Sequence, residues 1–316
     1  MPIPTPFAVG RVNTYLIDDD PLTLLDTGPN SATSLTTLEH ALAEHGRRVE
    51  DLERIVISHQ HIDHLGLVAI LAARSGAEVC ALDRLAPWLA GYSTHQDADD
   101  GYAEALMLRN GIPQDVTFAL RGVTASFRAW GSSAQVTHAL TDGGTLEFAN
   151  RSLRVWHRPG HSPSDTVLHD ERSGMLLGAD HLIKHISSNP LISRPLDGGD
   201  PADRPQALVI YMQSLRETSA MDLDFVLAGH GEAFDDHRKL IEDRFRLHDR
   251  RARKIGKLIA DRPSTAYEIA HELWGDIAVT QAYLTLSEVL GHVDLLVNDG
   301  LVQAVEDDDL IRYAAA

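Results

Sequence analysis

The chain has 316 residues, of which 43% are hydrophobic and 23% are charged, and its formal net charge is −18. This is the balance of an ordinary globular protein, and so negative a charge argues against general affinity for nucleic acids or anionic membranes. No apolar run approaches the ~20 residues of a membrane span, no signal-peptide pattern is present, and the single cysteine rules out an internal disulfide, so we expect a soluble cytoplasmic protein.

The first third of the chain alternates short apolar strands with amphipathic helices. Ser31 is a candidate helix cap, and Gly46 and Gly76 are candidate helix ends. The predicted elements are strands at 11–17 and 22–28, a helix at 31–46, a strand at 54–59, a helix at 65–76 and a strand at 78–83. This order indicates a layered α/β domain.

Residues 85–141 are less regular and contain several aromatic side chains among short helical patterns. An insertion of this size is more than a connector, and we expect it to cover a site as a lid. Tyr92, Tyr102 and Trp130 are candidates for lining an apolar pocket there, although aromatic residues more often lie in a core.

Strands resume at 145–148, 153–160, 166–171 and 175–180, and a helix at about 203–219 leads into a last strand at 224–230. The second half therefore repeats the α/β pattern, and we expect one domain over residues 1–236. A long helix ended by Pro263, two further helices and a hairpin then predict a winged-helix-like domain over residues 237–316. With the charge of −18, dimerisation or pocket closure suits this domain better than DNA reading.

Seven potential metal ligands lie at the ends of predicted strands. The sequence "HQHIDH" follows an apolar strand and contains four of them within six residues. Imidazole nitrogens and carboxylate oxygens bind zinc, and also iron or manganese. Four ligands so close together crowd a single tetrahedral ion, so the spacing favours two adjacent metals completed from elsewhere. The candidates are His59, His61, Asp63, His64, His161, Asp180 and His230.

These motifs, in this order, resemble the metallo-β-lactamase superfamily over roughly residues 10–235, with a glyoxalase II-like or lactonase-like hydrolase as the nearest type. The resemblance rests on His-x-His-x-Asp-His at 59–64, Pro-Gly-His at 159–161, Gly-x-Asp at 178–180 and Gly-His-Gly at 229–231. It implies a four-layer αββα sandwich with the metals at one edge between two sheets.

The same resemblance implies a role for each ligand. His59, His61 and His161 would hold a first metal, and Asp63, His64 and His230 a second, with Asp180 bridging the two. Asp26, in "LLDTG", would orient a ligand imidazole, although a turn cap is an alternative role. His181 and His185 lie close to the ligands in sequence and are candidates for substrate binding, with a solvated loop as the alternative.

We therefore expect a binuclear zinc hydrolase in which a hydroxide shared by the metals attacks an ester-like bond, a thioester or lactone first, with Asp63 as the catalytic acid/base. The substrate would be a small, uncharged or apolar molecule, and the protein a candidate homodimer. A metal-dependent nuclease is one alternative. A mononuclear iron enzyme similar to persulfide dioxygenases is another, but it needs only the first metal set.

Overall fold

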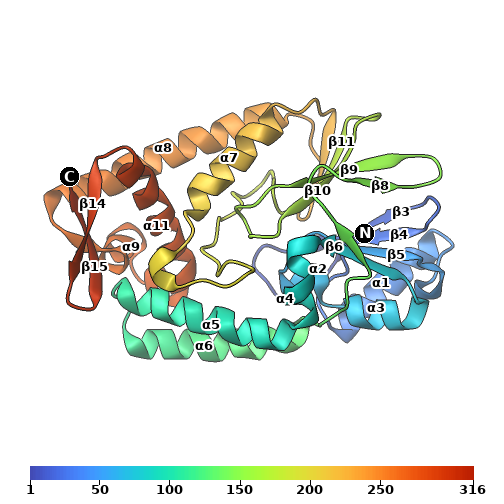
Figure 1. The fold of residues 1–316 in the computed structure, drawn as a ribbon, viewed down its shortest axis with the longest axis horizontal. Coiled ribbons are helices and arrows are strands. Elements are labelled where there is room, and N and C mark those ends of the chain that lie inside the picture. Colours follow the sequence, from blue (N-terminus) through green and yellow to red (C-terminus); the bar gives the residue numbers. More distant parts are fainter.

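The computed structural model describes residues 1–316 and places two five-stranded sheets between layers of helices (Figure 1). The first sheet has the order β3 (Tyr15–Ile17), β4 (Thr23–Leu25), β5 (Arg54–Ile57), β6 (Glu78–Leu82) and β7 (His138–Leu140). The second has the order β12 (Phe225–Ala228), β11 (Met175–Ala179), β10 (Thr166–Asp170), β9 (Ser152–His157) and β8 (Thr145–Glu147). Parallel pairing runs from β4 to β7 and joins β11 to β12, whereas the other pairs are antiparallel.

Helices α1 (Ala32–Glu44) and α3 (Val68–Ser75) cover the outer face of the first sheet. The side chain of Ser31 accepts a hydrogen bond from the Ser34 amide at the start of α1, and Gly76 ends α3 in the left-handed conformation, as predicted. Strand β5 shows the alternation that separates the layers, because Ile55 and Ile57 pack under the helices while Val56 points into the core between the sheets.

The second sheet is covered by α7 (Ala207–Ser219) and the first half of α8 (His237–Asp261). Leu208, Tyr211 and Leu215 of α7 pack on Val167 and Val226 of the sheet. A separate apolar core, which includes Cys80, lies between the two sheets. The order of layers is helix, sheet, sheet, helix, so the predicted αββα sandwich is confirmed.

The insertion at 85–141 is more regular than predicted. After α4 (Ala86–Ala90) it forms a hairpin of two long helices, α5 (Tyr92–Arg109) and α6 (Gln114–Phe127), before β7 rejoins the first sheet (Figure 1). The polar sequence of α5 has almost no apolar periodicity, so its helical character was not visible in the pattern.

The C-terminal segment contains the predicted helices and hairpin. After α8 come β13 (Ser264–Thr265), α9 (Ala266–Trp274), α10 (Ile277–Thr280), α11 (Ala282–Asn298), β14 (Val302–Asp307) and β15 (Leu310–Ala315), with the strand order β13-β15-β14. The apolar core of this segment also includes residues from outside it. Leu286 and Leu290 of α11 share one apolar cluster with Tyr102, Leu106 and Met107 of α5, so the insertion and the C-terminal segment pack on each other.

The remaining strands and α-helix are short: β1 (Pro2–Ile3), which pairs with β2 (Val12–Asn13), and α2 (Ile62–Leu65). Four 3-10 helices complete the chain: η1 (Val49–Asp51), η2 (Asp83–Leu85), η3 (Arg128–Trp130) and η4 (Pro201–Asp203). None of the helices combines the length and the apolar composition that crossing a membrane would require.

Candidate metal centre

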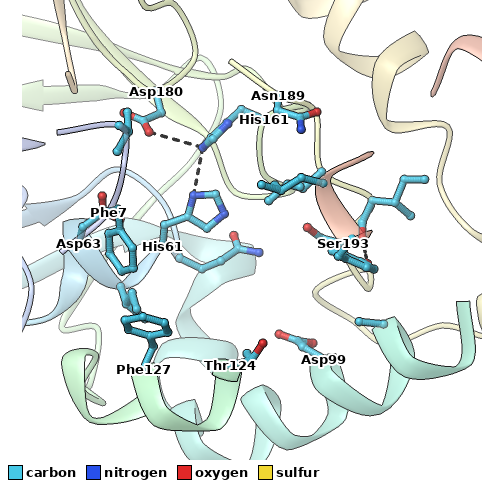
Figure 2. Close-up of a pocket in the computed structure, with 18 of the residues that line it drawn as sticks. Phe7, His61, Asp63, Asp99, Thr124, Phe127, His161, Asp180, Asn189 and Ser193 are labelled. Atoms are coloured by element: carbon cyan, nitrogen blue, oxygen red, sulfur yellow. Dashed lines mark hydrogen bonds and ion pairs between the residues drawn. The ribbon is translucent and has the colours of Figure 1, made fainter. Parts of the chain in front are cut away.

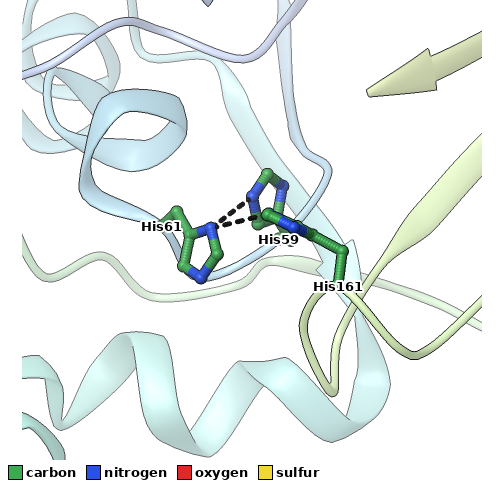
Figure 3. A group of neighbouring side chains, drawn as sticks. All are labelled: His59, His61 and His161. Atoms are coloured by element: carbon green, nitrogen blue, oxygen red, sulfur yellow. Dashed lines mark hydrogen bonds between the residues drawn. The ribbon is translucent and has the colours of Figure 1, made fainter. Parts of the chain in front are cut away.

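Three imidazoles converge at the edge between the two sheets. His59 and His61 follow β5, and His161 comes from the loop after β9 (Figure 3). The Nδ1 atom of His61 lies 3.0 Å from Nε2 of His59 and 3.0 Å from Nε2 of His161. Zinc binds imidazole nitrogens at about 2.0–2.1 Å, so three nitrogens this close together are spaced to share one ion.

A second group of donors lies beside the first. The Nε2 atom of His230 is 3.4 Å from Oδ2 of Asp63 and 3.4 Å from Oδ2 of Asp180. Oδ1 of Asp180 is 3.4 Å from Nε2 of His64, and Oδ2 is 3.5 Å from Nε2 of His161. The ligand atoms of Asp63, His64 and His230 all lie within 4.8 Å of one another. The structure therefore brings all seven predicted ligands together, with Asp180 between the two groups.

The buried polar atoms of this region fit a metal. His64 Nε2, His230 Nε2 and Asp180 Oδ1 are buried and have no hydrogen-bond partner. The opposite nitrogen of each imidazole is occupied, because Nδ1 of His64 lies 2.7 Å from Asp26 Oδ2 and Nδ1 of His230 lies 2.8 Å from the Arg11 carbonyl oxygen. Each ring is thus held with Nε2 directed at the centre, which is how proteins orient metal-binding histidines.

Asp26 orients its neighbours through three contacts. Its Oδ1 accepts a hydrogen bond from the Ser58 amide at 2.8 Å, and Oδ2 accepts one from the Ser58 hydroxyl at 2.7 Å besides its contact with His64. The backbone of Asp26 has a φ of 59°, in the left-handed region that non-glycine residues seldom adopt. This geometry supports the predicted role in orienting a ligand rather than a simple turn cap.

Two glycines of the motifs are required by close approach. A Cβ on Gly160, just before His161, would lie 2.4 Å from the Tyr211 Cα of α7. A Cβ on Gly229, just before His230, would lie 2.1 Å from Oδ1 of Asp180. Any side chain at these positions would displace the helix or the Asp180 carboxylate, so the ligand loops need glycine there.

The imidazoles fall into two electrostatic classes. Burial lowers the pKa of His59, and lowers that of His61 to about 3. Burial also lowers the pKa of His64 and His230, but the neighbouring carboxylates, Asp180 above all, raise it by more. As a result, the pKa of His64 lies well above its usual value, and that of His230 rises to about 9. In the metal-free protein, protons therefore compete with a metal at the second group of donors and not at the first.

This competition predicts how pH changes metal binding. Since the His230 proton must leave before Nε2 can bind an ion, Zn²⁺ affinity at the second group should rise at least ~10-fold per pH unit from pH 6 towards 9 and then level off. The pKa of His230 is higher in the folded protein than in the unfolded chain, so its protonation stabilises the fold of the metal-free protein. This contribution to the free energy of unfolding should be complete below pH 6.5 and should be lost as the pH rises through 9. Chelator competition and thermal unfolding across this range measure both effects, and a pH-independent Zn²⁺ affinity would contradict the assignment.

One further cluster of potential ligands lies apart from the centre, between α8 and α11. His248 Nδ1 and His292 Nε2 are 3.1 Å apart, and His292 Nδ1 donates to the Glu288 carbonyl oxygen at 2.6 Å. The Glu288 carboxylate is paired with Arg251. Because these groups already bond to one another, we interpret the cluster as a polar contact between helices.

A cavity of about 700 Å³ ends on the metal centre (Figure 2). Its inner end is formed by His61, Asp63, His161, Asp180 and His230. Most of the other walls are apolar and come from the N-terminal loop, α6, the loop after β11 and the start of α11: Phe7, Leu120, Phe127, Ile183, Ile186 and Leu284. The charged side chains on the remaining wall are paired, Arg194 with Asp99 at 2.7 Å and Arg121 with Glu104 at 2.5 Å.

None of the five side chains that the sequence suggested for a substrate pocket lines this cavity. Tyr92 and Tyr102 are buried in two apolar cores, and Trp130 lies in a turn at the end of α6. His181 is fully buried, with Nε2 2.8 Å from the Thr218 hydroxyl, and His185 lies in an exposed stretch beside Gly231. The structure therefore places these five side chains outside the lining of this cavity, and for Tyr92 and Tyr102 it agrees with the alternative of a core position.

The residues that do form the walls carried no signal in the sequence. Phe7 and Phe127, whose ring centroids lie 5.5 Å apart near Asp63, are about 120 residues apart in the chain (Figure 2). An apolar side chain looks the same in a local pattern whether it faces a core or a cavity. Only the lid role of the insertion was expected, and α5 and α6 do form part of the cavity wall.

Comparison with known proteins agrees with the geometry. A family model described as the metallo-beta-lactamase superfamily matches residues 8–230. The chain is 32% identical to the probable metallo-hydrolase YqjP of Bacillus subtilis (strain 168), over 93% of this chain and 90% of that protein. It is 21% identical to the beta-lactamase-like protein 2 homolog of Caenorhabditis elegans, over 95% of this chain and 83% of that protein.

Solved structures extend the likeness to the C-terminal segment. A metallo-beta-lactamase family protein from Thermus thermophilus superposes with a TM-score of 0.81 at 25% identity, covering 100% of this chain and 97% of that one. A beta-lactamase domain protein from Burkholderia ambifaria gives a TM-score of 0.83 at 25% identity, covering 100% and 91%. The chain therefore belongs to the metallo-β-lactamase superfamily of metal-dependent hydrolases.

Proposed function

We propose that this protein is a binuclear zinc hydrolase that cleaves an ester-like bond, a thioester or a lactone, in a small molecule. The observation that carries this proposal is a cavity of about 700 Å³, of the size that small-molecule sites have, ending on two complete groups of metal donors. Bound divalent ions would supply Lewis acidity and a water molecule of lowered pKa.

The chain's own residues supply the rest of the chemistry. Asp63 lines the cavity, and although burial raises its pKa, the contact with His230 and the charge of His64 lower it below the usual value. The Asp63 carboxylate is therefore ionised at neutral pH and able to orient a water molecule and accept its proton. The apolar walls exclude bulk water and would hold an uncharged substrate against the donors.

Two alternatives fit less well. A nuclease needs cationic groups that follow a phosphate backbone, but Arg121 and Arg194 of the cavity are both paired with carboxylates and the net charge is −18. A mononuclear iron enzyme needs only the first three imidazoles, which would leave the buried Asp63, His64 and His230 without a purpose.

Metal analysis together with a substrate panel tests this function. We expect about two Zn²⁺ per chain and hydrolysis of thioesters or lactones that chelation abolishes and Zn²⁺ restores. Fe²⁺ and Mn²⁺ reconstitution and single-stranded oligonucleotides belong in the same panel. A chain that binds one ion, or that cleaves only oligonucleotides after reconstitution, would overturn the proposal.

A further inference from the structure

Ser187, Ser188 and Asn189 form a polar segment in the wall of an otherwise largely apolar cavity. They follow one another in the loop after β11, and all three line the cavity. Asn189 and the candidate metal ligand His161 line the same cavity (Figure 2). A substrate held at the metal centre would therefore pass this segment.

The polar atoms of this segment lack partners within the protein. Ser187 Oγ, Ser188 Oγ and Asn189 Oδ1 are buried and form no hydrogen bond of 3.5 Å or less, although Ser188 lies close to the Tyr211 side chain. Ser188 as a whole is only 3% exposed. A buried polar atom without a hydrogen bond destabilises the folded state, so several of them in one loop call for an explanation.

The unpartnered buried atoms of this segment are consecutive in the chain. This is the only run of three consecutive residues among the unpartnered buried side chains of the chain. The candidate metal donors His64 Nε2, Asp180 Oδ1 and His230 Nε2 also have no hydrogen-bond partner, and these atoms are free to bind an ion. By the same reasoning, the segment 187–189 awaits a ligand group.

The chemistry of the segment defines that group. Hydroxyl and carboxamide side chains both donate and accept hydrogen bonds and carry no charge. Arg194 is the cationic residue of the cavity that lies nearest to this segment in the sequence, and its side chain is already bonded to Asp99 and His95. The segment is therefore built for a neutral group that both donates and accepts, which is the pattern of an amide.

We propose that Ser187, Ser188 and Asn189 form a subsite for an uncharged amide of the substrate, an inference that rests on the proposed function and narrows it. The substrate class is then an ester-like compound with an apolar body and an amide group away from the scissile carbonyl. These residues determine specificity and leave the bond-breaking step to the metal centre.

Paired thioesters that differ only in an amide test this subsite. One pair compares hexanoyl N-acetylcysteamine with S-pentyl hexanethioate, and the other compares the S-pentyl thioesters of N-acetylglycine and pentanoic acid. With the zinc-loaded protein, we expect the amide member of at least one pair to be preferred roughly tenfold or more in kcat/KM.

The Ser187→Ala/Asn189→Leu double variant should reduce this preference to within about twofold, mainly through KM, because it removes hydrogen bonds and preserves side-chain size. Thr124→Val is the matched control: Thr124 lines the same cavity, but its hydroxyl already donates to the Leu120 carbonyl oxygen at 3.1 Å. This control should keep the wild-type preference.

Equal rates within both pairs in the wild type, or a preference that survives in the double variant, would overturn the subsite and leave the hydrolase function standing. If no thioester or lactone is cleaved, the hydrolase function itself fails. The subsite is then decided by calorimetry with the thioether analogues of the first pair, where weaker binding of the amide member than of its partner would overturn it.

Discussion

Replacing Asp180 with asparagine is expected to reduce the metal content from about two ions per chain to one or fewer, and hydrolysis by ~10³-fold or more. The carboxylate lies 3.4 Å from His64 Nε2 and from His230 Nε2 and 3.5 Å from His161 Nε2, so both groups of donors depend on its charge. Lewis-acid stabilisation is worth several kcal/mol, and each 1.36 kcal/mol is a factor of ten in rate.

Asp170→Asn is the matched control for this experiment. Asp170 is also a buried aspartate of the second sheet, but it accepts hydrogen bonds from the Arg172 and Ser173 amides at the turn between β10 and β11. Elemental analysis and kcat/KM should show a metal-loaded, active control. An Asp180→Asn protein with two ions and undiminished activity would refute the bridging role.

Replacing Leu290 with alanine is expected to destabilise the entire chain by about 2–5 kcal/mol, in a single unfolding transition. Leu290 of α11 is fully buried in the cluster that also contains Tyr102, Leu106 and Met107 of the insertion. Since the cavity left by the truncation lies in a core shared by both parts, the C-terminal segment should not unfold by itself.

Denaturant unfolding followed by both fluorescence and circular dichroism measures this effect. Leu301→Ala is the matched control, because Leu301 is 59% exposed and its truncation should change the free energy of unfolding by less than about 0.5 kcal/mol. Two separate transitions in the Leu290→Ala protein would show that residues 237–316 fold as an independent domain.

The shared core also explains how the C-terminal segment affects the candidate active site. The hydroxyl of Tyr283 donates to the Ile192 carbonyl oxygen, and the Ile192 amide donates to the Ser287 hydroxyl at 3.3 Å. Helix α11 thereby fixes the loop that forms one cavity wall, and Tyr283 and Leu284 line the cavity themselves. The C-terminal segment thus contributes to the cavity wall, while the two roles that the sequence suggested for it, dimerisation and pocket closure, stay predictions.

The amino-acid sequence by itself determined the sandwich and the identity of the seven candidate ligands. Strand ends are local features, and residues such as His59, His61 and His64 stand so close in sequence that their chemistry is visible without a fold. The other ligands stand beside glycines that their loops require, as at Gly160 and Gly229. These features can be recognised in the sequence because each depends only on residues that are neighbours in the chain.

Only the tertiary structure decided the cavity and the partners of the C-terminal segment. Phe7, Phe127, Asn189 and Leu284 come from four distant segments, and nothing local distinguishes a side chain that faces a cavity from one that faces a core. The two alternatives for Tyr92, a cavity wall or a core, were left open for the same reason, because its burial beside Trp88 depends on helix packing. Long-range packing is a property of the assembled layers, and a local pattern does not contain it.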